Sequence, residues 1–194
     1  KSNAHDRAYY VTGLALAPAR IGGHGNVCPS STAGCRASCV LWFAGRTVTQ
    51  SVRNAAIQRT EALATDRAAF LEQLHAEIGK HAKRAAKLGA VPVVRLNVAS
   101  DLDWRSVAAA HPGVVFYDYT KVRARVVDYL EGRYPANYHL TYSYSERDAA
   151  DDVSRDPARV TAPRDPESTG GVKATDDVGE PTLQLLERID EHHD

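Results

Sequence analysis

The sequence has no long apolar run, few cysteines and no net charge. No stretch approaches the roughly 20 apolar residues that span a bilayer, and no signal-peptide pattern opens the chain. The hydrophobic fraction of 43% and the charged fraction of 25% are ordinary for a globular protein. We therefore expect a soluble, cytoplasmic protein with no membrane partner. The sequence alone leaves its oligomeric state open.

The net charge of zero conceals an uneven distribution. Residues 151–194 contain 12 acidic and 5 basic side chains, whereas residues 1–150 contain 12 acidic and 19 basic ones. A basic body with an acidic tail occurs in proteins that meet nucleic acid, although a solvated surface beside an acidic tail is the commoner explanation. We expect one α/β domain over residues 1–148 and an acidic, partly irregular extension over residues 149–194.

Apolar periodicity predicts strands that alternate with helices. The predicted strands are residues 9–18, 91–101, 113–121 and 137–146. The predicted helices are residues 49–64, 66–88, 102–110 and 123–132, with a further helix possible over residues 182–193. Residues 20–48 read as a loop. Such alternation is typical of a parallel sheet, so we predict an incomplete parallel (β/α) barrel-like sheet with an N-terminal cysteine loop.

The three cysteines, Cys28, Cys35 and Cys39, all lie in the stretch NVCPSSTAGCRASCV. An odd number of cysteines argues against a disulfide framework. A loop rich in Ser, Gly and Pro offers little apolar surface in which to bury structural thiols. Thiolates are soft ligands that select zinc, copper(I) or iron–sulfur clusters. The domain is therefore expected to bind a metal, with these cysteines as its ligands.

The spacing of the cysteines leaves the metal open. Structural zinc takes four ligands, commonly as two close pairs, and here only His24 could complete a Cys3His site. An iron–sulfur cluster is held by cysteine thiolates, and three of them suit a 3Fe-4S cluster or a 4Fe-4S cluster with one open iron. We favour a cluster and keep zinc as the alternative.

A second set of polar residues follows the predicted central strands. Parallel α/β proteins bind ligands at the carboxyl ends of their strands, where the cysteine loop would also lie. The candidate ligand-binding residues at these ends are Asn97, Ser100, Asp101, Tyr119, Lys121 and Ser143. Some of them have ordinary alternatives: Asp101 or Ser100 could cap the helix that begins near Leu102, and Lys121 could be a solvated loop lysine.

Several segments resemble the phage and prophage family called gene product 88. The resemblance runs from about Tyr9 to Glu146, and its most specific pieces are the cysteine loop, the Ser-Asp at 100–101 and the Tyr-Thr-Lys at 119–121. The other segments that carry it are NAAIQRT, FLEQLHAEIGKHAKRAAKLGAVPVVRLNVASDLDW and NYHLTYSYSE. The resemblance implies a phage-type protein that acts in the cytoplasm of a host cell.

The family's pattern is itself similar to the iron–sulfur-bearing partial barrels of the radical S-adenosylmethionine superfamily. Both place a three-cysteine loop after the first strand and follow it with strand–helix units. The present spacing of six and then three residues differs from that superfamily's three and then two. No clear glycine-rich adenosylmethionine motif follows the second strand.

Two classes of function follow from these observations. The first is an iron–sulfur protein that binds a small molecule or nucleotide at an open iron beside the polar residues. The second is a nucleic-acid-binding module in which zinc or a cluster is purely structural, the basic helices contact phosphates and strand tyrosines stack on bases. A loop-stapling or redox-sensing cluster is a third. The sequence does not decide whether the protein is an enzyme, and its substrate is equally open.

Overall fold

The computed structural model describes residues 8–43, 49–145 and 147–148. The chain divides into two units, residues 1–146 and 147–194, and the first unit contains every element described below. The helix predicted over residues 182–193 lies outside the described residues, as does almost all of the predicted extension over residues 149–194.

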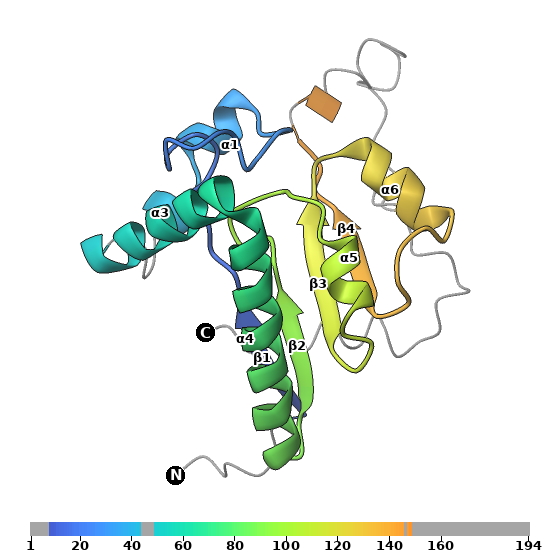
Figure 1. Ribbon diagram of the computed structural model, residues 1–194. Helices are drawn as coiled ribbons and strands as arrows, with labels where there is room; N and C mark the ends of the chain where they lie inside the picture. The colour runs from blue at the N-terminus through green and yellow to red at the C-terminus, as the bar shows by residue number, and fades with distance from the viewer. Residues whose placement is uncertain (1–7, 44–48, 146, 149–194) are drawn as a thin grey trace, which may run out of the picture. The chain divides into compact units, whose positions relative to one another are not determined.

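Four strands form one parallel sheet in the order β1-β2-β3-β4 (Figure 1). They are β1 (Tyr9–Gly13), β2 (Val91–Arg95), β3 (Val115–Thr120) and β4 (Tyr138–Tyr142). Tyr9 pairs with Val91, and Phe116 pairs with Tyr138. The predicted α/β fold, with parallel strands alternating with helices, is confirmed.

The first two strands end earlier than predicted. β1 stops at Gly13 and not at residue 18, and β2 stops at Arg95 and not at residue 101. The reason is visible at Asn97, whose backbone N–H donates to the side chain of Asp118 (2.7 Å) where a longer strand would pair with a neighbouring backbone. The chain therefore leaves the sheet early and forms polar loops at the carboxyl ends of the strands.

Helices cover one face of the sheet. They are α3 (Gln50–Thr65), α4 (Arg67–Lys87), α5 (Arg105–Ala109) and α6 (Arg123–Leu130), and Figure 1 shows α4 lying along β1 and β2. Asp66 caps α4 by accepting a hydrogen bond from the backbone of Ala69 (2.9 Å), and Gly89 follows its end with a positive φ of 65°. None of the described helices combines the length and apolar character needed to cross a membrane.

The region predicted as a loop over residues 20–48 contains two short helices, so that prediction was wrong for them. These are α1 (Ala33–Ala37) and α2 (Val40–Phe43). Thr32 caps α1 by accepting a hydrogen bond from the backbone of Cys35 (3.0 Å), and Ser38 closes its other end through the carbonyl of Gly34 (2.8 Å). A single helical turn carries too little apolar periodicity to be seen in a sequence.

The core lies between the sheet and α4. Its fully buried large side chains include Leu16, Leu96, Trp104 and Phe116. Thr60 of α3 fastens the chain after β1 to this core, because its hydroxyl accepts a hydrogen bond from the buried backbone N–H of Ala17 (2.8 Å). The segment that leads to the cysteines therefore starts from a fixed point.

Candidate metal centre and ligand cavity

A cavity of about 980 Å³ opens at the carboxyl ends of the strands. Its walls come from the cysteine loop and from the segments that follow β2, β3 and β4. The residues predicted from the sequence as metal ligands or ligand-binding residues all line it: Cys28, Cys35, Cys39, Asn97, Ser100, Asp101, Tyr119, Lys121 and Ser143. The volume is at the upper end of the range for small-molecule sites.

Cys28 is the most firmly placed of the three cysteines. Its Sγ donates to the carbonyl of Ala99 (3.2 Å) and accepts from the backbone N–H of Ala19 (3.3 Å). Ala19 has a left-handed φ of 52°, a conformation that is unfavourable for a residue with a Cβ and that directs its N–H at the sulfur. Burial raises the pKa of the Cys28 thiol to about 11.

Cys35 and Cys39 belong to the helical part of the loop. Cys35 lies in α1, Cys39 lies between α1 and α2, and all three cysteines are half-buried free thiols. Among the residues that the structure describes, no three His, Cys, Asp or Glu side chains converge closely enough to hold one metal ion. His24 is exposed and does not line the cavity.

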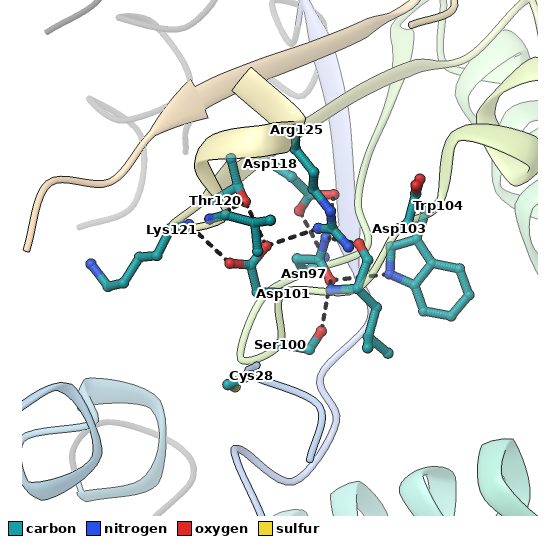
Figure 2. Close-up of polar contacts among 12 residues, drawn as sticks. Cys28, Asn97, Ser100, Asp101, Asp103, Trp104, Asp118, Thr120, Lys121 and Arg125 are labelled. Atoms are coloured by element: carbon teal, nitrogen blue, oxygen red, sulfur yellow. Dashed lines mark hydrogen bonds and ion pairs between the residues drawn. The ribbon is translucent and has the colours of Figure 1, made fainter. Parts of the chain in front are cut away.

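Asn97 is the centre of a buried hydrogen-bond network at the cavity wall (Figure 2). Its Oδ1 accepts hydrogen bonds from Ser100 Oγ (2.9 Å), the backbone of Leu102 (2.9 Å) and Trp104 Nε1 (3.1 Å). Its Nδ2 donates to the carbonyl of Leu102 (2.9 Å) and to Asp118 Oδ2 (3.3 Å). The amide therefore positions the loop after β2, and its polar atoms already have partners.

Asp101 joins the loops after β2 and β3. It accepts hydrogen bonds from Thr120 Oγ1 (2.8 Å) and the backbone of Lys121 (2.9 Å), and it forms an ion pair with Arg125 of α6 (2.9 Å). The capping alternative was wrong, because the side chain that meets the start of α5 is Asp103, which accepts from the backbone of Arg105 (3.1 Å).

Lys121 reaches across to the end of β4. Its Nζ donates to Ser143 Oγ (2.7 Å) and to the carbonyls of Ser143 and Tyr144 (3.3 Å each). The alternative of a solvated loop lysine is therefore wrong. All three acceptors are neutral, so the ammonium keeps its full charge at the cavity wall.

Asp118 is a buried carboxyl group at the end of a central strand that was not among the ligand-binding residues predicted from the sequence. It accepts hydrogen bonds from the Asn97 backbone and from Tyr138 Oη (2.7 Å each). Desolvation nevertheless raises its pKa to about 7, and the hydrogen bonds and the nearby charge of Arg95 only partly oppose that rise. The alternation of β3 turns this side chain toward the buried network.

Three cationic residues of the cavity were also missed from the sequence: Arg20, Arg36 and Arg95. Arg95 ends β2, and its guanidinium lies over the ring of Tyr119, with 4.8 Å between Cζ and the ring centroid. One signal was available, since a single charge follows the apolar run VPVV at the carboxyl end of a predicted strand. Arg20 and Arg36 carry no such signal in their loop.

Comparison with known protein families shows the family to which the chain belongs. A family model described as Gene product 88 matches residues 1–193. The chain belongs to the Gene product 88 family. No curated protein and no solved structure matches it.

The family match over residues 1–193 is longer than the resemblance described above, which ended near residue 146, and it includes most of the acidic segment over residues 149–194. Binding of nucleic acid by its basic helices stays a prediction.

Proposed function

We propose that this Gene product 88 protein holds an iron–sulfur cluster on Cys28, Cys35 and Cys39 and binds a small molecule or nucleotide in the same cavity. The observation that carries the proposal is the shared cavity. Its wall combines the three thiols with the polar residues that follow β2, β3 and β4. Ligand sites of parallel α/β proteins occur at this end of the strands.

The chemistry of the donor set suits a cluster, although the three thiols do not converge on a single ion in this structure. Three free thiols come from one short loop and line one cavity, and sulfur is the donor that iron–sulfur clusters require. The N–H of Ala19 already points at Cys28 Sγ, and hydrogen bonds to sulfur tune the potential of a cluster. A cluster with three cysteine ligands supplies an open iron that can bind a ligand or transfer an electron.

Zinc is the less favoured metal. A structural zinc site needs a fourth ligand, and the histidine considered for it, His24, is exposed and away from the cavity wall. Asp101 is also occupied, because both of its carboxylate oxygens accept hydrogen bonds from Thr120, Lys121 or Arg125.

The chain's own residues would prepare the site. Cys28 must lose its proton to bind metal, and its raised pKa makes that loss depend on the metal. Thr32 fixes the start of the turn that carries Cys35. Lys121 and Ser143 join the loops after β3 and β4 and present polar atoms beside the thiols.

The test is anaerobic purification followed by iron and acid-labile sulfide analysis and an electron paramagnetic resonance spectrum. We expect iron with sulfide in the unaltered protein and a loss of most of both in Cys35→Ser. Ser38→Ala is the control, because Ser38 lies at the end of the same helix and carries no thiol. The spectrum separates the 3Fe-4S form from the 4Fe-4S form.

Other outcomes would contradict the proposal. Stoichiometric zinc without sulfide would show the zinc alternative to be correct. Iron retained at the same level in Cys35→Ser would show that this cysteine is not a ligand.

A further inference from the structure

Arg95 carries a charge for which the described chain provides no hydrogen-bonded partner. Its Nε is buried and has no hydrogen-bond partner, and no carboxylate forms an ion pair with its guanidinium among the described residues. A buried donor without a partner destabilises the fold, because it has lost its hydrogen bonds to water and gained none in exchange. A functional role, such as binding a ligand, is one explanation for a buried polar group that has no partner.

Two tyrosines hold the guanidinium in place. Its Cζ lies 4.8 Å from the ring centroid of Tyr119 and 5.8 Å from that of Tyr117, both on β3. Stacking on an aromatic ring fixes the plane of an arginine and leaves its edge N–H groups free to donate. Arg95 also lines the cavity that contains the three cysteines. The side chain is therefore preorganised at a ligand cavity.

The cavity as a whole has an excess of positive charge. Among the residues that the structure describes, its lining includes Arg20, Arg36, Arg95 and Lys121, against a single carboxylate, Asp101. Asp101 is already neutralised by Arg125, which lies 2.9 Å away. Within the described part of the chain, Arg36 donates to the neutral oxygens of Ser31, and Lys121 donates to the neutral oxygens of Ser143 and Tyr144.

We infer that this cavity binds the phosphate group of a small molecule, with Arg95 and Lys121 as the recognising cations. Arginine matches the oxygens of a phosphate with two parallel hydrogen bonds, and lysine adds a point charge. Several cations around one cavity suit a multiply charged phosphate better than a single carboxylate. The inference rests on the proposed function, in which the ligand and the cluster share one cavity. It adds the chemical class of the ligand.

Isothermal titration of the anaerobically purified protein with inorganic pyrophosphate tests the inference, with succinate as the carboxylate probe. We expect pyrophosphate to bind more tightly than succinate. Arg95→Gln and Lys121→Gln should each weaken pyrophosphate binding about 10- to 100-fold, the usual worth of a hydrogen bond to a charged group. Arg84→Gln is the control, because it removes the same charge from the exposed side of α4, outside this cavity.

Iron and sulfide measured on the same samples separate this inference from the proposed cluster. Pyrophosphate binding that depends on Arg95 in a protein without iron would support the inferred phosphate site and contradict the proposed iron–sulfur cluster. An iron-loaded protein that binds no pyrophosphate, or binds it equally well in Arg95→Gln and Arg84→Gln, would overturn the inference. Preference for succinate would overturn it too, because the cations would then serve a carboxylate.

Discussion

Asp118 gives the cysteine-lined cavity a buried neighbour whose charge changes near neutral pH. It is 1% exposed, and the groups that face it are Asn97 and Arg95 from the β2 side, Tyr138 from β4 and the carboxylate of Asp101. Burial and the charge of Asp101 favour the protonated acid, whereas the hydrogen bonds and Arg95 favour the carboxylate. The balance determines how much of the positive charge of Arg95 is compensated inside the fold.

This carboxyl group predicts a pH dependence of stability. Its pKa in the folded protein is about 7 against an ordinary value of 3.8, so its contribution is fully present below pH 3.8 and is lost as the pH rises through about 7. One such proton changes the free energy of unfolding by at most about 1.4 kcal/mol per pH unit. Urea unfolding across this range should show that fall in the unaltered protein and no such contribution in Asp118→Asn.

The quantity to follow is the difference in the free energy of unfolding between the two proteins at each pH, because the contributions of the other titrating groups cancel in that difference. If the two curves run parallel, the pKa of this carboxyl group is the same in the folded and unfolded proteins, and its hydrogen bonds and Arg95 fully offset desolvation.

At the scale of single elements, the short helix α1 determines how the cysteines are presented. Thr32 is 2% exposed, and its hydroxyl accepts the backbone N–H of Cys35 at the first turn. Arg36 in the same helix reaches back to the carbonyl of Ser31 (2.7 Å). These contacts hold the turn to the loop that precedes it. The direction of the Cys35 thiol therefore depends on the cap that Thr32 provides.

Replacing this cap should loosen the cysteine loop. Thr32→Val keeps the shape of the side chain and removes the acceptor, which should destabilise the turn by about 0.5–2 kcal/mol. If the loop holds a cluster, the variant should lose iron faster when a chelator is added. Thr65→Val is the matched control, because it removes an exposed hydroxyl from the end of α3. Equal rates of iron loss would show that the cap does not support the metal.

The elements also show what could be predicted from the sequence. Long periodic segments predicted the strands and the helices α3 and α4, because burial of one face imposes its period on the residues. Parallel strands end at the same edge, which is why residues as distant as Cys28 and Ser143 could be assigned to one site in advance. The helices α1 and α2 were missed, since a single turn shows no period. Arg95 was missed because its role depends on Tyr119 of another strand.

At the scale of the whole molecule, a single core links the helices, the sheet and the loop that leads to the cysteines. Leu16 is fully buried in it, shortly after β1, and Val27 of the same core immediately precedes Cys28. The core therefore holds the cysteine loop at both of these points.

Removing part of this core should affect both stability and the site. Leu16→Ala should lower the free energy of unfolding by about 2–5 kcal/mol, through lost burial and the cavity left behind. Val11→Ala is a control, because Val11 lies on β1 and is 37% exposed. Urea unfolding measures the free energy of unfolding of the two variants. A loss below 1 kcal/mol in Leu16→Ala would show that the segment after β1 does not share the core.

The pairing of Tyr9 with Val91 joins segments that the ribosome makes at different times, so β1 must wait for β2 during synthesis. The ribosome makes β1 and the whole cysteine loop before it makes β2, the strand with which β1 pairs. Closing so long a loop is entropically costly, and parallel pairings between distant segments form slowly. During that interval the three thiols have no cavity around them. Oxygen in the expression culture can therefore reach the thiols of nascent chains. If the protein holds the proposed cluster, the yield of iron-loaded protein should rise when cells are grown slowly and without air.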